Sequence, residues 1–404
     1  MEGIQGVVLA GGRGSRMDLL CSLRAKPTLP FAGRLRVVDF VLTNCVRSQI
    51  KNMTVMVDYQ RDHMADYLGQ WGAANAGLTN IFVLQPEAGS YAGTADAVYQ
   101  NLSYLNAQSG DKLLVLAGDH IYRMDYRDMI AFHEKVNADA TVGVIRVPIE
   151  EAHRFGTVVT DAQGRIQEFV EKSSSPSSNL ASMGIYVFNK DVISERLVED
   201  AGKSDSPHDF GYSILPEMVK RDRVFAYEFN GYWQDIGTVE AYYQANMELL
   251  VSRPRFSLDS NWPILGENSA PPALTESADG NIVNSLISPG CIIKGRVENS
   301  ILSPGIRVEE QAIIRNSIIM ANASVGYHSV IDNCILDEGV HVGQSCYIGF
   351  GSGLLPGNWD ITVLGKDVIV PAHTAIGRKC KVLPKAGPDD FTASLIPAGT
   401  MVPA

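Results

Sequence analysis

Four nearly identical stretches lie in the second half of the chain: Val283-Asn284-Ser285-Leu286-Ile287, Glu298-Asn299-Ser300-Ile301-Leu302, Arg315-Asn316-Ser317-Ile318-Ile319 and Asp332-Asn333-Cys334-Ile335-Leu336. Their asparagines are 15, 17 and 17 residues apart, and aliphatic residues recur every five or six positions between glycines. A period near three times six is typical of one triangular coil of a parallel β-helix, with the aliphatic side chains inside. Residues 368–382 show the same recurrence of aliphatic residues. The repeat predicts a left-handed β-helix domain over residues 281–404, whereas a plain β-sandwich, the alternative, needs no such repeat.

The first half of the chain alternates between short apolar runs and helical patterns. We expect strands at residues 6–10, 53–57, 81–84, 113–117, 140–147 and 166–170, and helices at 37–49, 94–105 and 125–136. Strands that alternate with helices favour βαβ units and a mostly parallel, Rossmann-like sheet, so residues 1–252 are predicted to form an α/β domain. Residues 253–280, which are Pro-rich between 262 and 272, are interpreted as the linker to the β-helix.

The composition excludes several classes of protein. The chain has 404 residues, 45% of them hydrophobic, and 34 Lys and Arg against 45 Asp and Glu give a net charge of -11. The acidic balance argues against general nucleic-acid binding, although a few local cations could still bind a phosphate substrate. The six cysteines form no C-x-x-C pair, which favours buried free thiols over a zinc site or a disulfide framework. A strand-like run follows Met1 closely and no apolar run approaches ~18 residues, so we expect a cytoplasmic protein without a signal peptide or membrane contact.

The first expected strand ends in a glycine-rich turn, Gly11-Gly12-Arg13-Gly14-Ser15-Arg16. Glycines directly after a strand let backbone N–H groups approach a phosphate, and a helix that starts there favours negative charge. The turn matches neither a Walker A loop nor the G-x-G-x-x-G dinucleotide pattern. Its two arginines favour binding of a triphosphate. The alternative interpretation is a turn with a structural role and no ligand. Lys26, which precedes a rigid proline, lies ten residues after Arg16. Alone it would be an exposed loop charge, but together with the turn it predicts a phosphate clamp.

Two strand ends carry candidate ligand groups. Asp119 follows the strand at 113–117, and ligands of open α/β sheets gather beyond the carboxyl ends of the strands. A carboxylate there is a natural ligand for the Mg²⁺ that accompanies a nucleotide, and a turn or N-cap aspartate is the alternative. The neighbouring His120 is interpreted as structural, because a phosphate nucleophile needs no base. Glu171-Lys172 ends the strand at 166–170, where Lys172 could hold a second phosphate as a point charge or simply be a solvated strand end.

Residues 232–238, Tyr-Trp-Gln-Asp-Ile-Gly-Thr, add an aromatic wall at Trp233, or a core aromatic, and a second carboxylate at Asp235. Together these segments resemble the sugar-phosphate nucleotidyltransferases, in particular the bacterial branch that forms ADP-glucose. The resemblance rests on the turn at 11–16 and on RAKPTLPFAGRLRVVDFVLTNC at 24–45, GTADAV at 93–98, LAGDHIY at 116–122, EFVEK at 168–172, ASMGIYVF at 181–188, HDFG at 208–211 and YWQDIGT at 232–238. These motifs stand in the order of the family.

The resemblance implies a role for each matching position. It places the ATP phosphates on Gly11, Gly12 and Gly14 with Arg13, Arg16 and Lys26, and the adenine beside Tyr91, Gly93 and Thr94. The phosphate of glucose 1-phosphate is placed on Lys172, and Mg²⁺ on Asp119 and Asp235. The residues implied to surround the sugar are Glu171, Ser182, Tyr186, Asp209, Trp233 and Asp235. Gly118, Gly156 and Gly184 belong to the same substrate-binding set. The residues expected to carry catalysis are Arg13, Arg16, Lys26, Asp119 and Asp235.

The implied reaction is in-line attack of a glucose 1-phosphate oxygen on the α-phosphorus of ATP, which yields ADP-glucose and pyrophosphate and supplies glycogen or α-glucan synthesis. Because both reactants are anions, cations and metal rather than a general base must neutralise the developing charge. We also expect a homo-oligomer, a tetramer, that associates through the β-helix, because the end coils of a β-helix expose unpaired strand edges that association would cover. Two alternatives remain open: a non-catalytic regulatory subunit, which would have lost the charges, and an enzyme for another sugar 1-phosphate or base.

Three positions depart from the family pattern. Leu23 stands where members activated by fructose bisphosphate carry a Lys, Asp58 where many have a Gln implicated in activation, and Ala92 where an Arg often precedes the turn at 93–94. The usual allosteric activation is therefore not expected, whereas the catalytic set is complete.

Overall fold

The computed structural model describes residues 3–258, 261–266, 273–275, 281–351 and 360–404. They divide into two compact units. The first unit comprises Met1–Arg13 and Val37–Gln234, and the second comprises Gly14–Arg36 and Asp235–Ala404. The chain therefore crosses between the units inside the glycine-rich turn, again after Arg36 and again after Gln234. Of the Pro-rich connector predicted at 262–272, residues 267–272 lie outside the described part.

A mixed β-sheet forms the centre of the first unit, in the order β10-β9-β11-β6-β1-β4-β5, with β8 between β11 and β12. The strands are β1 Ile4–Leu9, β4 Asn52–Met56, β5 Asn80–Leu84, β6 Lys112–Ala117, β8 Ala140–Arg146, β9 Gly156–Thr160, β10 Ile166–Glu171, β11 Leu180–Asn189 and β12 Val224–Glu228. The block β6-β1-β4-β5 is parallel, and β11 pairs antiparallel with β6 and β8. Buried parallel strands read as continuous apolar runs, which is why they were predictable.

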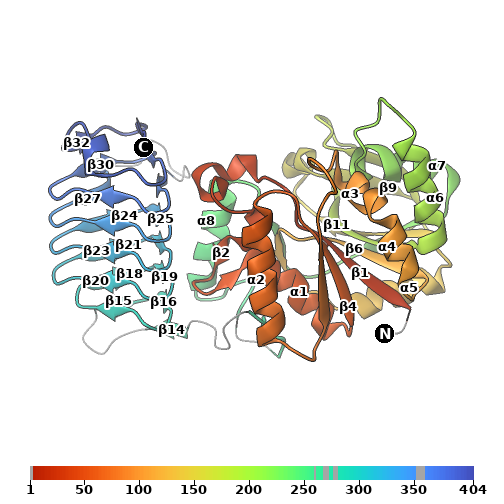
Figure 1. The fold of residues 1–404 in the computed structure, drawn as a ribbon, viewed down its shortest axis with the longest axis horizontal. Helices are drawn as coiled ribbons and strands as arrows, with labels where there is room; N and C mark the ends of the chain where they lie inside the picture. Colours follow the sequence, from red (N-terminus) through yellow and green to blue (C-terminus); the bar gives the residue numbers. More distant parts are fainter. Residues whose placement is uncertain (1–2, 259–260, 267–272, 276–280, 352–359) are drawn as a thin grey trace. The chain divides into compact units, whose positions relative to one another are not determined.

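Helices cover this sheet (Figure 1): α1 Val37–Arg47, α2 Arg61–Ala74, α3 Thr94–Gln100, α4 Leu102–Ala107, α5 Tyr126–Lys135, α6 Lys190–Ala201 and α7 Leu215–Arg221. Shorter elements are η3 Ile149–Arg154, the π-helical turn η4 Phe210–Ile214, and the strands β7 His120–Tyr122 and β13 Trp233–Asp235. The single helix expected over 94–105 is broken at Asn101, whose φ and ψ are -104° and 9°. Its side-chain amide donates to the Ala97 carbonyl at 2.8 Å, and such local bonds compete with helix continuation.

A left-handed parallel β-helix dominates the second unit and confirms the predicted repeat (Figure 1). One face consists of β15 Ile282–Val283, β18 Arg296–Glu298, β21 Ile313–Arg315, β24 Val330–Asp332, β27 Tyr347–Phe350, β30 Ala375–Gly377 and β32 Leu395–Ile396. A second has β16 Ser285–Ile287, β19 Ile301–Leu302, β22 Ile318–Ile319, β25 Cys334–Leu336, β28 Thr362–Leu364, β31 Lys381–Val382 and β33 Met401–Val402, with β14 Ala273–Thr275 antiparallel to β16. The third has β17 Ile292–Ile293, β20 Arg307–Val308, β23 Ser324–Val325, β26 His341–Val342 and β29 Ile369–Val370.

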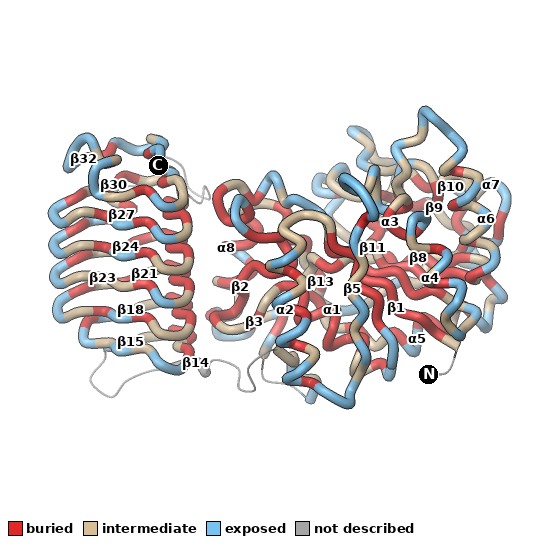
Figure 2. The backbone as a smooth tube through the Cα atoms, viewed as in Figure 1, coloured by how far each residue is buried: buried red, intermediate tan, exposed pale blue. Residues whose placement is uncertain are grey.

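The repeated Asn-Ser-aliphatic step has a direct physical reason. Asn284, Asn299, Asn316 and Asn333 all have φ between +44° and +52°, a left-handed conformation that asparagine tolerates better than most residues. The following side chains form a ladder: the Ser300 amide donates to Ser285 Oγ and the Cys334 amide to Ser317 Oγ, both at 3.1 Å. The aliphatic residues that end the second, third and fourth steps, Leu302, Ile319 and Leu336, are fully buried inside the coil, and Ile287 of the first step is partly buried. Buried stretches recur in the same way along the strands of the β-helix in Figure 2. The left-handed corner and the inward aliphatic residue therefore recur together in the four steps.

The segment 14–36 and the helix after residue 238 pack on the second face of the β-helix. This part contains η1 Ser15–Cys21, η2 Lys26–Thr28, β2 Pro30–Phe31, β3 Leu35–Arg36, α8 Val239–Met247 and η5 Glu248–Leu250, and the far end of the chain adds η6 Pro388–Asp390. The Tyr243 hydroxyl donates to the Asn316 carbonyl at 2.6 Å, and Leu250 packs on Ile301. All six cysteines are free, and all but the half-buried Cys291 are buried, as the sequence predicted. In the residues that the structure describes, no helix combines the length and apolar character needed to cross a membrane.

Candidate active site

The glycine-rich turn is shaped by two close approaches. A Cβ on Gly11 would lie 2.9 Å from the Asp58 Cβ, so only glycine fits there. Gly14 has a φ of +63°, and a Cβ on it would lie 3.1 Å from the Lys26 Cβ. Gly12 differs, because no atom lies within 4 Å of a Cβ built on it. The turn is therefore held at Gly11 and Gly14, and its backbone is open at Gly12, where a phosphate could approach.

The helix expected after this turn is only a 3₁₀ element, η1, broken at Asp18, where φ is 52° and ψ is -127°. A helix dipole needs several aligned peptides, so this short and kinked element contributes little to anion binding. The two arginines of the turn are exposed, and the Arg13 guanidinium lies 5.9 Å from the centre of the Tyr59 ring. Positive charge in this region therefore comes from side chains more than from a helix end.

Within the second unit, three predicted site residues meet. Lys26 Nζ lies 3.4 Å from Asp235 Oδ1, and the two side chains are 7% and 11% exposed, so Lys26 is not an exposed loop charge. A Cβ on Gly237 would lie 3.0 Å from both Arg16 Nη2 and Asp235 Oδ2. The close approach of this cation and this carboxylate explains why position 237 of the motif at 232–238 is a glycine. The arrangement offers two cations and one carboxylate to a charged ligand.

In the first unit, Asp119 lies two residues beyond the end of β6 and is partly exposed, as expected for a ligand group beyond a strand end. Its Oδ1 lies 3.6 Å from His120 Nε2. Two glycines of the predicted substrate-binding set are explained by packing around this strand end. A Cβ on Gly118 would lie 3.0 Å from the Leu9 carbonyl oxygen, and one on Gly184, whose φ is +67°, would lie 3.1 Å from the Ala117 Cβ.

A partly buried ion pair ends β10. Lys172 Nζ lies 3.2 Å from Glu171 Oε1, with the Glu171 side chain 15% exposed and that of Lys172 48% exposed. Burial raises the pKa of Glu171, and the charge of Lys172 opposes that rise. Lys172 has a φ of +48°, which is uncommon for a residue with a side chain, and its amide donates to the Phe155 carbonyl at 3.0 Å. The backbone thus turns sharply where the pair is presented.

The other predicted sugar-contacting groups of the first unit are aromatic rings and hydroxyls. Ser182 Oγ and the Tyr186 hydroxyl lie 3.4 Å apart on β11, where the strand register shifts. Trp233 packs edge-on against Phe155 and His120, with ring centres 5.3 and 5.1 Å away. Among the described residues, the buried Trp233 Nε1 has no hydrogen-bond acceptor. A buried donor without an acceptor is unfavourable, and a hydroxyl-rich ligand would satisfy it.

The structure joins two motifs that the sequence separates by more than a hundred residues. Thr94 Oγ1 donates to Asp209 Oδ2 at 2.8 Å. A Cβ on Gly93 would lie 2.3 Å from the carbonyl oxygen of His208, so glycine is required by this contact. Tyr91, half-buried, accepts a hydrogen bond from Asn101 Nδ2 at 3.1 Å, and burial raises the pKa of its hydroxyl. The turn at 93–94, for which the resemblance implies adenine contacts, is therefore also anchored to the segment around Asp209.

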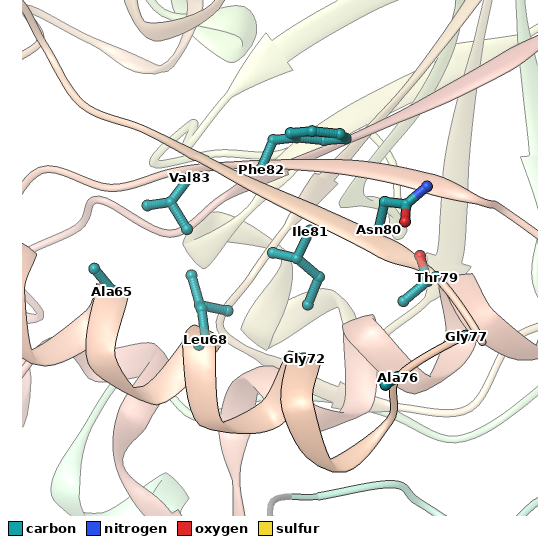
Figure 3. Close-up of a pocket in the computed structure, with 11 residues that line it drawn as sticks. Ala65, Leu68, Gly72, Ala76, Gly77, Thr79, Asn80, Ile81, Phe82 and Val83 are labelled. Atoms are coloured by element: carbon teal, nitrogen blue, oxygen red, sulfur yellow. The ribbon is translucent and has the colours of Figure 1, made fainter.

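A separate groove lies between α2 and the edge strand β5 (Figure 3). Its lining residues are small, apolar or uncharged: Ala65, Leu68, Gly69, Gly72, Ala76, Gly77, Thr79, Asn80, Ile81, Phe82 and Val83. A nucleoside triphosphate or a sugar phosphate needs cations, and this lining has none. None of the predicted site residues belongs to it.

The donors available for a metal are carboxylate oxygens. No cluster of three or more His, Cys, Asp or Glu side chains that could hold a metal occurs in the described ranges. Mg²⁺ does not need such a cage, because it usually keeps waters and binds through one or two carboxylates plus substrate phosphates. Asp119 in the first unit and Asp235 in the second are donors of the kind that it prefers. The residues present therefore fit a hard divalent cation brought in with a nucleotide.

Comparison with known proteins agrees with this geometry. The family model described as Nucleotidyl transferase matches residues 5–252, more than half of the chain. The chain belongs to the nucleotidyl transferase family. A second model, described as GlmU-like, C-terminal hexapeptide, matches residues 271–353 of this family member, in the region of the β-helix.

Curated relatives place this nucleotidyl transferase more closely. It is 40% identical over 400 residues to the glucose-1-phosphate adenylyltransferase of Acetivibrio thermocellus. The aligned region covers 95% of this chain and 94% of that protein. It is 41% identical to the enzyme of that name from Fervidobacterium nodosum, over 94% of each chain, and 39% identical to that from Thermomicrobium roseum, over 100% of this chain and 98% of that one. The resemblance found in the sequence is confirmed.

Proposed function

We propose that this nucleotidyl transferase joins ATP and α-D-glucose 1-phosphate to form ADP-glucose and pyrophosphate, for glycogen or α-glucan synthesis. The Lys26–Asp235 pair carries the proposal, because with Arg16 it brings together the cations and the carboxylate that nucleotidyl transfer needs and that a non-catalytic subunit would have lost. The names of the relatives, which cover nearly the whole chain, support the same substrates.

In this reaction an oxygen of glucose 1-phosphate forms a bond to the α-phosphorus of ATP, and the bond to the bridging oxygen of the leaving pyrophosphate breaks. No covalent enzyme intermediate and no general base are required. Arg13, Arg16 and Lys26 would hold the ATP phosphates, and Lys172 would hold the phosphate of the sugar. Positioning two anions against their repulsion is worth far more than proton transfer here.

Mg²⁺ is the proposed cofactor, with Asp119 and Asp235 as its protein ligands. When bound, it would neutralise charge on the phosphates. Both carboxylates lie near cations or a histidine, so they contribute oxygens without leaving an isolated negative charge. Asp209, Glu171 and Trp233 would contact sugar hydroxyls.

The test is a steady-state assay of the purified protein with Mg²⁺, in which ATP, UTP and dTTP are each offered with several sugar 1-phosphates. We expect ADP-glucose as the dominant product, identified by chromatography against standards. A Lys26→Met variant should be inactive, and circular dichroism checks its folding, because the substitution removes the cation beside the buried Asp235. Preference for UTP or dTTP, or for another sugar 1-phosphate, would replace the proposed substrates, and no nucleotide sugar from any pair would overturn the activity.

We also propose that the protein acts as a homo-oligomer, a tetramer, in the cytoplasm, where both substrates are produced. The last β-helix coil supports association, because Leu395 and Met401 are each 57% exposed on strands β32 and β33 at the end of their sheets. Sedimentation equilibrium tests this proposal, and a monomer at micromolar concentration would contradict it.

A further inference from the structure

The π-helical turn η4 is held rigidly at its start. Asp209 Oδ1 accepts hydrogen bonds from the amides of Gly211 and Tyr212 at 2.8 and 3.1 Å. The other oxygen of that carboxylate accepts from Thr94 Oγ1, and the Phe210 amide donates to the same hydroxyl at 3.0 Å. π-Helical turns are rare and occur frequently at functional sites. The residues after Asp209 are therefore fixed relative to the sheet.

Gly211 lies directly against the Glu171 carboxylate. A Cβ on Gly211 would lie 2.5 Å from Glu171 Oε2 and 2.7 Å from its Cδ. From β9, a Cβ on Gly156 would lie 2.4 Å from the same oxygen. Two glycines from different elements thus form a slot that admits this carboxylate, and any side chain at either position would displace it.

Tyr212 lies against the other member of the pair. Lys172 Nζ lies 5.8 Å from the centre of the Tyr212 ring, within the range of a cation–π contact. Tyr212 is 53% exposed, so its ring can also be reached by a ligand that binds beside Lys172. A lysine side chain has high rotamer entropy, and in the described part of the chain Glu171 and the Tyr212 ring are the partners that restrict its ammonium group. The ring restrains the ammonium without neutralising its charge.

We propose that the turn Phe210–Ile214 positions the Glu171–Lys172 pair for the sugar 1-phosphate, with Gly211 seating the carboxylate and Tyr212 holding the ammonium. The inference rests on the proposed function, in which Lys172 binds the sugar phosphate. Gly211 and Tyr212 are positioning residues, since they act through the pair. This role differs from that of Asp209, which caps the turn and would contact the sugar.

The test compares Tyr212→Leu, Tyr212→Phe and the wild-type protein. Loss of an exposed cation–π contact should raise the KM for glucose 1-phosphate about two- to five-fold, with kcat and the KM for ATP unchanged. Tyr212→Phe keeps the ring and should restore most of that affinity. Tyr99→Leu, which removes another partly exposed tyrosine of the same unit, is the matched control and should change neither KM.

A double-mutant cycle shows whether Tyr212 acts through Lys172. In a Lys172→Met background, Tyr212→Leu should have no further effect on the KM for glucose 1-phosphate. Gly211→Ala should lower kcat/KM for glucose 1-phosphate by more than about tenfold, because it displaces Glu171, with thermal unfolding as the check on folding. If Gly211→Ala does not fold, the Tyr212 variants alone test whether the turn positions the Glu171–Lys172 pair.

The inference would be overturned if Tyr212→Leu left both KM values unchanged. It would also be overturned if this substitution had the same effect with and without Lys172. In either case, formation of ADP-glucose by the wild-type protein would still uphold the proposed function. A wild-type protein that forms no ADP-glucose would overturn the proposed function and this inference with it.

Discussion

The Arg24 guanidinium lies 2.7 Å from the Asp337 carboxylate, and each side chain is 2% exposed. Glu338 extends this pair, at 3.1 Å from Arg24 and 2.9 Å from Arg36, and Lys366 lies 3.2 Å from the same glutamate. Buried charges persist only when they are paired and hydrogen-bonded. The cluster therefore joins the segment 14–36, which carries Lys26, to the β-helix within the second unit.

Removing Arg24 should destabilise the second unit strongly. Arg24→Met would leave Asp337 buried without its closest cation, and breaking a buried pair from one side costs about 3–5 kcal/mol. We expect a large decrease in the denaturant midpoint, followed by circular dichroism. Arg307→Met, at an exposed position of β20, is the control and should change stability by less than about 0.5 kcal/mol. Equal midpoints for the two variants would show that the pair is unimportant for stability.

Glu338 should make the protein sensitive to acid, although Asp337 in the same cluster, whose pKa is raised by burial, opposes this effect. Burial raises the pKa of Glu338, but Arg24, Arg36 and Lys366 outweigh it and lower the pKa from 4.5 to about 2. A carboxylate with a lowered folded-state pKa contributes stability above pH 4.5 that is lost as the pH falls toward 2, on the order of 3 kcal/mol.

Denaturant midpoints measured from pH 7 to pH 2.5 test this sensitivity. Glu338→Gln should be less stable at pH 7 and should lose less stability on acidification than the wild type. Parallel pH profiles for the two proteins would show that another group controls acid unfolding.

Asp119→Asn should leave the fold intact and lower turnover by several orders of magnitude, because a proposed metal ligand is lost. The position of Asp119 beyond β6 motivates this prediction. Single-turnover assays at saturating Mg²⁺ measure it, with Asp128→Asn on the exposed side of α5 as the control. Near-normal turnover in Asp119→Asn would remove this residue from the catalytic set.

Lys172→Gln should raise the KM for glucose 1-phosphate about 10- to 100-fold and leave that for ATP nearly unchanged. A charge contact that is equally strong in the ground and transition states alters KM more than kcat. Lys220→Gln, an exposed lysine of α7, is the matched control for the loss of a positive charge. Similar increases in both KM values would mean that Lys172 does not serve the sugar phosphate alone.

Fructose 1,6-bisphosphate should activate the enzyme weakly or not at all. Leu23 is 40% exposed and provides no charge, and the neighbouring Arg24 is already paired with the buried Asp337 and the partly buried Glu338. Each missing charge-assisted contact weakens the binding of a bisphosphate by about 1.5–3 kcal/mol. A titration at subsaturating ATP measures the response, with Leu23→Lys alongside. Activation of about tenfold or more at submillimolar effector would contradict the prediction.

Local patterns in the sequence were sufficient for the β-helix and for six strands of the first unit, but β9, β11 and β12 of the same sheet were not predicted. In the β-helix, the corner asparagines with positive φ, the hydroxyl ladder and the inward aliphatic residues recur with one period, so each coil repeats the information of the previous one. The strand ends at Asp119 and Glu171 followed from the same kind of local signal, the boundary of an apolar run. The break at Asn101 did not, because it depends on one side-chain amide that bonds its own helix.

Contacts between distant segments required the tertiary structure. Arg24 and Asp337 are 313 residues apart, and nothing in the sequence around either residue specifies a buried partner. The roles of Gly211 and Gly156 became visible only when Glu171 was found between them, since a glycine in a sequence does not reveal what approaches it. Periodic backbone patterns are encoded locally, because hydrogen-bond geometry and apolar spacing repeat along the chain. A charge pair or a close approach depends on which surfaces the folded chain brings together, and this is why only the three-dimensional structure identifies Tyr212 as the ring beside Lys172.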